Sequence, residues 1–102
     1  MIGITEPRRI ATTSLATRIA HELTGKPVGH EVGYQIRYDS NTCSDNTVVK
    51  LMTDGILLKE LENGLAEQYS VIIIDEAHER SVNTDILISL LSRIVRIRVK
   101  LA

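Results

Sequence analysis

The chain has 102 residues, enough for one domain or for part of one. Its 12 basic and 13 acidic residues nearly cancel, which excludes nucleic-acid binding through a global positive field. Cys43 is the single cysteine, so a disulfide within the chain is excluded, and no apolar run approaches the roughly 20 residues of a membrane span. We therefore expect a soluble, intracellular chain.

The first predicted elements are a strand and a long helix. Residues 1–5 are apolar and β-prone, which predicts a strand. A helix is predicted over about 8–24, because apolar residues recur on one face and Gly25 can end it. That apolar face consists of Leu15, Ile19 and Leu23, with Ala16 and Ala20 beside them.

The next segments predict two strands separated by a loop. Residues 32–38 alternate apolar and polar side chains, which is the period of a half-buried strand. Residues 39–46 consist almost wholly of turn formers and predict a loop, whereas residues 47–52 are β-prone again. A short helix is then predicted to start at Thr53 or Asp54, either of which can cap it.

Four consecutive β-branched residues at 71–74 run directly into two carboxylates. A run this short, without polar alternation, predicts a strand covered on both faces, as in a parallel sheet between helices. Asp75 and Glu76 then fall at the carboxyl end of the strand, where open α/β sheets bind ligands.

A last helix is predicted after these acids, with Asn83 or Thr84 as its cap. Its apolar stripe comprises Ile86, Leu87, Leu90, Leu91, Ile94 and Val95. Strands that alternate with helices predict an α/β fold with a mostly parallel sheet flanked by helices.

Adjacent carboxylates at a strand end repel each other, and burial penalises their charge further. A divalent cation offsets both costs, and Mg²⁺ suits one or two carboxylates together with phosphate oxygens. One acid can then hold the ion while the other orients or deprotonates an attacking water. Taken alone, the pair favours an incidental acidic turn, whereas the full run 71–80 favours a metal site.

The stretch 71–80 resembles the Walker B motif (motif II) of the DEAH-box RNA helicases. Residues 75–78 spell Asp-Glu-Ala-His, the signature that names the family, and Glu-Arg follows. The resemblance implies ATP and Mg²⁺ as cofactors. It implies that Asp75 binds Mg²⁺, that Glu76 helps to position the ion and activates the attacking water, and that His78 links the nucleotide site to a second domain.

Two further segments resemble motifs with which this family contacts the RNA backbone. Arg8 and Arg9 match motif Ia, and guanidinium forks near a helix amino end suit phosphate oxygens. Thr53, Asp54 and Gly55 match motif Ib. By themselves, the first segment is better explained by two solvated arginines, and the second needs nothing more than a helix cap. The resemblance implies RNA as a partner, gripped without reading its bases.

The resemblance covers nearly the whole chain, and it implies a partial RecA-like (P-loop NTPase) domain. Residues 1–102 would form an internal fragment of this ATP-binding domain, from motif Ia to just past motif II. The phosphate-binding loop G-x-x-x-x-G-K-[ST] is absent from the sequence, so the fragment lacks the P-loop strand. We therefore expect the strand at 71–74 to have at least one unpaired edge, and the isolated chain to be loosely folded and inactive.

The implied parent is an ATP-dependent RNA helicase, which couples ATP hydrolysis to RNA unwinding or remodelling. The alternative is a non-catalytic truncated product, or a fragment that binds RNA or protein. Residues 80–87 and 91–93 look closest to nucleolar members of the family. This implies a nuclear, nucleolar location and a role in ribosome biogenesis, and it leaves a G-patch-type adaptor protein open as a partner.

Overall fold

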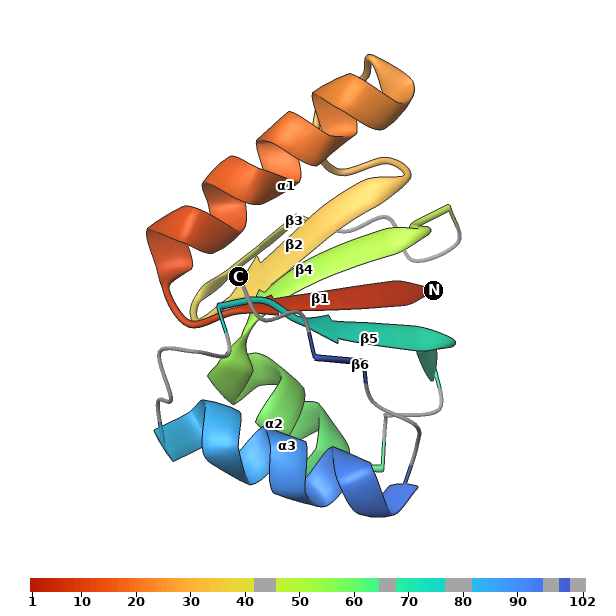
Figure 1. Ribbon diagram of the computed structural model, residues 1–102. Coiled ribbons are helices and arrows are strands. Elements are labelled where there is room, and N and C mark those ends of the chain that lie inside the picture. Colours follow the sequence, from red (N-terminus) through yellow and green to blue (C-terminus); the bar gives the residue numbers. More distant parts are fainter. Residues whose placement is uncertain (42–45, 65–67, 77–81, 95–97, 100–102) are drawn as a thin grey trace.

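A six-stranded sheet with helices on both faces organises the chain (Figure 1). It is seen in a computed structural model, which describes residues 1–41, 46–64, 68–76, 82–94 and 98–99. The elements are β1 (Ile2–Glu6), α1 (Arg9–Thr24), β2 (Val32–Ile36), β3 (Asp39–Asn41), β4 (Val49–Thr53), α2 (Asp54–Glu62), β5 (Val71–Ile74), α3 (Val82–Ile94) and β6 (Arg98–Val99). The predicted α/β class is confirmed.

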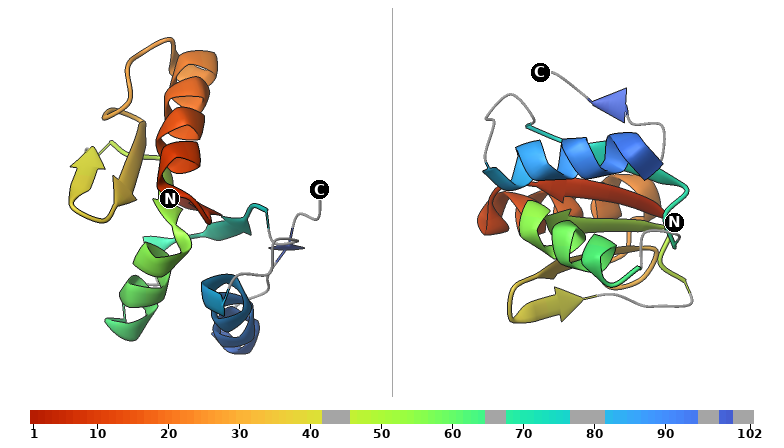
Figure 2. Two further views of the ribbon diagram at one scale, coloured as in Figure 1. Left: turned by 90° about the vertical axis from the view of Figure 1, so that its left-hand side faces the viewer. Right: turned by 90° about the horizontal axis from the view of Figure 1, so that it is seen from below.

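The strand order is β3-β2-β4-β1-β5-β6, and every neighbouring pair is parallel except β2 with β3. Helix α1 covers one face of the sheet, and α2 and α3 lie together against the other (Figures 1 and 2). Because β4, β1 and β5 run in the same direction, their carboxyl ends meet at one edge. Residues that follow these strands are therefore neighbours, although they are far apart in the sequence.

Each face of the sheet has its own core. The core under α1 is formed by Ala16, Ala20, Val32, Val49 and Leu51. The core under α2 and α3 is formed by Met52, Leu57, Tyr69, Ile74, Leu87 and Leu91. Two side chains predicted to be apolar contacts are instead exposed, Leu23 by 66% and Ile86 by 41%. Ile86 lies away from the face of α3 that carries the buried Leu87 and Leu91, so that predicted stripe was too wide. Leu23 shares a face with the buried Ala16 and Ala20 but lies at the carboxyl end of α1.

Strand β5 is less covered than predicted. Ile74 is fully buried, whereas Val71 is 49% exposed. The reason is that α1 packs over β2 and β4 and leaves the α1 side of β5 open. The expected unpaired edge is wrong for Ile73 and Ile74, which pair with the two-residue β6. In the described part of the chain, Val71 and Ile72 pair with β1 alone.

The segment predicted as a loop after β2 begins with a strand. Asp39–Asn41 forms β3, which pairs antiparallel with β2, and Ile36 lies opposite Asp39. The two-residue turn between them includes Tyr38 in the left-handed region, at φ 66°. Glycine or asparagine usually occupies such a turn, so the sequence carries no hairpin signal here. Residues 42–45, including Cys43, lie outside the described part of the chain.

The helix ends agree with the sequence in one case and differ in two. Gly25 closes α1 at φ 68°, as predicted. Thr53 stands at the cap position of α2 but makes no side-chain hydrogen bond to the helix. Helix α3 begins at Val82, ahead of both predicted caps, Asn83 and Thr84. None of the helices in the described residues is long and apolar enough to cross a bilayer.

Candidate functional site

Three carboxylates meet at the carboxyl edge of the sheet, where β1 and β5 end. The register pairs Thr5 with Ile74, which makes Glu6 and Asp75 neighbours in the next row. The backbone N–H of Asp75 donates to the carbonyl of Thr5 at 3.0 Å and extends the ladder by one bond. Glu76 then leaves the strand at φ 57°, a left-handed conformation that is uncommon for glutamate.

Glu6 is the member of this cluster that sequence reasoning missed. Its side chain is 3% exposed, and its pKa is raised from 4.5 to about 8. Burial is the largest cause, followed by its hydrogen bond with Asp75 and by the negative charges of Asp75, Glu76 and Asp54. The signal for it was available: residues 1–5 and 71–74 were both predicted as strands of a mostly parallel sheet, and an acid follows each of them.

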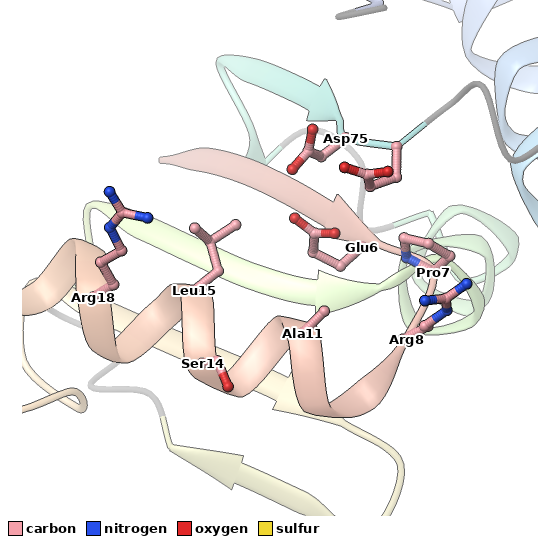
Figure 3. A pocket seen from close by; sticks show the side chains of 9 residues that line it. Glu6, Pro7, Arg8, Ala11, Ser14, Leu15, Arg18 and Asp75 are labelled. Carbon is pink, nitrogen blue, oxygen red and sulfur yellow. The ribbon is translucent and has the colours of Figure 1, made fainter. Parts of the chain in front are cut away.

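A pocket of about 480 Å³ opens above the acids, between the sheet and α1 (Figure 3). Glu6 and Asp75 point into this space, with Arg8 and Arg18 at opposite ends of it (Figure 3). The remaining lining residues are Pro7, Ala11, Ser14, Leu15 and Glu76. The pocket therefore presents an acidic floor with two flanking cations.

The acids suit one type of metal ion better than others. No group of three or more His, Cys, Asp or Glu side chains in the described residues could hold a metal by itself. Mg²⁺ needs no such group, because it keeps several waters and takes one or two carboxylates together with phosphate oxygens. A cation would also offset the repulsion that keeps a proton on Glu6. Asp75 and Glu76 thus fit a Mg²⁺ site that is completed by water and phosphate.

A second hollow, of about 520 Å³, lies on the other side of Pro7 and is basic. It unites the two segments predicted to contact RNA, since Arg9 lines it together with Thr53 and Gly55. We call this hollow the basic groove. Its full lining is Pro7, Arg9, Arg37, Thr53, Asp54, Gly55, Ile56, Lys59 and Asn83.

The basic groove includes residues that the sequence analysis had not selected. Arg37 and Lys59 add two cations to Arg9, and the Arg9 guanidinium donates to the carbonyl of Arg37 at 3.2 Å. The Arg37 guanidinium also lies 4.8 Å from the centre of the Tyr38 ring. No local motif marks these two residues. Arg37 lies in the turn between β2 and β3, and Lys59 lies on α2, and only the fold brings them together.

The predicted RNA-contacting residues do not all face the same way. Arg8, the cap residue of α1, lines the acidic pocket and not the basic groove, whereas its neighbour Arg9 lines the groove. Asp54 is 3% exposed, and its Oδ2 accepts a hydrogen bond from the Thr84 hydroxyl. His78, predicted as a catalytic residue, lies outside the described residues.

Comparison with known proteins gives the chain clear relatives, although no protein-family model matches it. It is 59% identical to "Probable ATP-dependent RNA helicase DHR1" of Saccharomyces cerevisiae over 99% of its length. Over 96% of its length it is 57% identical to "ATP-dependent RNA helicase DEAH13" of Arabidopsis thaliana. "Probable ATP-dependent RNA helicase DHX37" of Homo sapiens is 54% identical over 98% of the chain.

The chain spans only 8% of the length of each of these relatives. The matches nevertheless cover nearly all of its own residues. With 54–59% identity to three helicases from yeast, plant and human, the chain belongs to the DEAH-box family of ATP-dependent RNA helicases.

Proposed function

We propose that this chain is a segment of an ATP-dependent RNA helicase, in which it supplies the acidic side of the ATP site and part of the RNA-binding surface. The observation that carries the proposal is the placement of the two hollows. An acidic pocket and a basic groove adjoin at Pro7, on one edge of one sheet. This arrangement suits a protein that hydrolyses a nucleotide beside a bound polyanion.

At the acidic pocket, we assign Asp75 and Glu76 to Mg²⁺, which neutralises phosphate charge when it is bound. Glu76 also orients the attacking water and accepts its proton. The left-handed backbone of Glu76 supports a functional role, because strained conformations of this kind gather at active sites. The role of His78, the link to a second domain, rests on the family resemblance.

At the basic groove, we assign the phosphate contacts of RNA to Arg9, Thr53 and Gly55. The amino end of α2 presents free N–H groups there, and Gly55 has no side chain to keep a phosphate away. Arg8 would contact RNA at the boundary between the two hollows. Asp54 is a carboxylate and repels phosphate, so its contribution is indirect.

We further propose that residues 1–102 are an internal part of a RecA-like domain, running from motif Ia to just past motif II. The open α1 side of β5, with Val71 half exposed, supports this, because a buried parallel strand needs cover on both faces. The resemblance of residues 80–87 and 91–93 supports a role in nucleolar ribosome biogenesis, and it leaves a G-patch-type adaptor open as a partner. A fluorescent fusion that stays out of nucleoli would contradict that finer assignment.

A non-catalytic role for the chain by itself is the second candidate function. The absence of a phosphate-binding loop from the sequence favours it, since the acids alone cannot hold the phosphates of ATP. The genomic sequence decides between the candidates. An in-frame G-x-x-x-x-G-K-[ST] segment upstream of Met1 favours the helicase, and a stop codon directly upstream favours the non-catalytic product.

The decisive experiment is the substitution Glu76→Gln in the complete helicase, meaning the protein whose sequence includes this chain. Loss of the water-activating carboxylate should lower the ATP turnover number by about 10²-fold or more. Affinity for a fluorescent ATP analogue should stay unchanged, because the amide preserves the shape of the site. Glu62→Gln, an exposed position on α2, is the matched control. Undiminished turnover in E76Q would remove the assignment.

A further inference from the structure

One hydrogen bond joins the beginnings of two helices that are distant in the sequence. The hydroxyl of Thr84, near the start of α3, donates to Oδ2 of Asp54, the first residue of α2. Both residues are inaccessible to solvent, Asp54 being 3% and Thr84 1% exposed. The two helices lie side by side on the same face of the sheet (Figure 1). The bond therefore fixes one helix start against the other.

Asp54 is poorly explained as a ligand for RNA but well explained as an anchor. Its neighbours Thr53 and Gly55 line the basic groove, where phosphate is proposed to bind. Its own carboxylate carries the charge that phosphate repels. Its second oxygen, Oδ1, has no hydrogen-bond partner among the described residues. Thr53 is held in the sheet opposite Glu6, and the contact between Asp54 and Thr84 additionally ties the turn to α3.

Thr84 is equally poorly explained as a helix cap, because α3 begins two residues before it. Its neighbour Asn83 reaches the basic groove, and the Asn83 amide lies 3.6 Å from the position that a Cβ on Gly55 would occupy. Helix α3 is also the first described element after Asp75 and Glu76. Thr84 therefore stands on the element that connects the nucleotide-side acids to the RNA-side turn.

We propose that Thr84 is a positioning residue for RNA-stimulated ATP hydrolysis. Through Asp54 it holds the start of α2 in the orientation in which Thr53 and Gly55 receive the RNA backbone. The inference rests on the proposed function, and it replaces direct RNA contact by Asp54 with an indirect role. Thr84 itself touches neither the nucleotide nor RNA.

The test uses the complete helicase and measures ATP turnover against RNA concentration. Thr84→Val keeps the shape of the side chain but removes the donor, and Thr84→Ser restores the donor. T84V should raise the RNA concentration for half-maximal stimulation about fivefold to tenfold, the range of a modest coupling between sites. Turnover without RNA, and the KM for ATP, should stay within about twofold of wild type, because no transition-state contact is lost.

The conservative variant and a double-mutant cycle separate positioning from general damage. T84S should return the RNA requirement to that of wild type. D54A should shift the RNA requirement as T84V does, and the double variant should shift it no further, since both changes break the same bond. Thr17→Val is the control for a lost hydroxyl on an exposed helix face, where Thr17 donates only within α1, to the Thr13 carbonyl at 3.0 Å.

Three results would overturn the inference. T84V could show the RNA requirement of wild type, the D54A and T84V effects could add fully, or T84V could lower turnover without RNA as much as turnover with it. The last of these would assign Thr84 a merely structural role. A wild-type helicase that RNA fails to stimulate is a different result, because it overturns the proposed function itself.

Discussion

Two glutamates, Glu60 and Glu6, are buried on opposite faces of the same sheet, and their surroundings differ completely. Glu60 is 9% exposed and accepts hydrogen bonds from Lys50 at 3.0 Å, Gln68 at 2.7 Å and Tyr69 at 2.6 Å. Glu6 is 3% exposed, and its charged neighbours are the acids Asp75, Glu76 and Asp54. Burial is nearly equal, so the difference between them is electrostatic.

The surroundings of Glu60 are built to keep a charge inside the fold. Lys50 stands between Gly3 and Gly33 in the sheet register. A Cβ on Gly3 would lie 2.9 Å from the Tyr69 ring, so glycine is required for that ring to pack there. Burial and the Glu60 carboxylate raise the pKa of the Tyr69 hydroxyl, which therefore stays a donor.

The comparison shows that the neighbours of a buried carboxylate indicate whether its role is structural or functional. Where the chain supplies cations and donors, as it does for Glu60, the carboxylate is complete and its role is structural. Where acids of the described chain raise the pKa of a buried carboxylate, as Asp75, Glu76 and Asp54 do for Glu6, a proton or a cation stabilises the site. The predictions below test this distinction.

The largest effect is expected from Glu60→Ala. It leaves the Lys50 ammonium buried without its partner, which should cost about 3–5 kcal/mol of stability. Hydrogen exchange of the α2 backbone amides in the complete helicase measures this loss locally. Glu62→Ala, exposed on the same helix, should change exchange by about 0.5 kcal/mol or less. A loss below about 1 kcal/mol in E60A would show that the ion pair does not hold α2.

A smaller effect is expected at Glu6. Here, loss of the carboxylate charge should stabilise the fold at high pH, whereas at Glu60 loss of the carboxylate destabilises it. The pKa of Glu6 is about 8 in the folded chain against an ordinary 4.5, so the folded state binds the proton more tightly than the unfolded state. Its contribution to stability is therefore complete below pH 4.5 and is lost as the pH rises through about 8. Glu6→Gln cannot ionise and should escape that loss, which is on the order of 2–4 kcal/mol.

The measurement is the difference in melting temperature between E6Q and wild-type helicase, from pH 5 to pH 9, with EDTA present. This difference should grow in favour of E6Q as the pH rises, because all other titrating groups are common to both proteins. A difference that stays constant with pH would show that Glu6 is ionised throughout. E62Q serves again as the exposed control.

The sequence predicted the positions of helices and strands better than it predicted how strands pair. Apolar periodicity located α1, and β-prone composition located β1, β4 and β5, all to within about two residues. Strand β3 was missed, because its residues are turn formers. They form a strand only by pairing with β2, across a turn in which Tyr38 has a left-handed backbone. That pairing is tertiary, so no local propensity indicates it.

In the acidic pocket and the basic groove, too, the sequence identified residues that are marked along the chain and missed those that only the fold brings together. The acids at 75–76 were identified because they follow a strand directly, and Arg9 and Thr53 because they match short motifs. Glu6 was missed because it neighbours Asp75 across the sheet and not along the chain. The Asp54–Thr84 bond spans 30 residues and depends on how α2 and α3 pack, which spacing alone does not encode.

The smallest effect is expected for a third glutamate, Glu22, which is paired but exposed. It lies 3.2 Å from the Arg18 guanidinium on α1, and the two side chains are 61% and 74% exposed. Water screens this pair, so Glu22→Gln should lower the melting temperature by about 1 °C or less, corresponding to about 0.3–0.5 kcal/mol. Glu22 has a partner, like Glu60, yet it needs none, because solvent stabilises its charge. A large loss in E22Q would mean that pairing decides stability regardless of burial, and the contrast between Glu60 and Glu6 would then lose its physical basis.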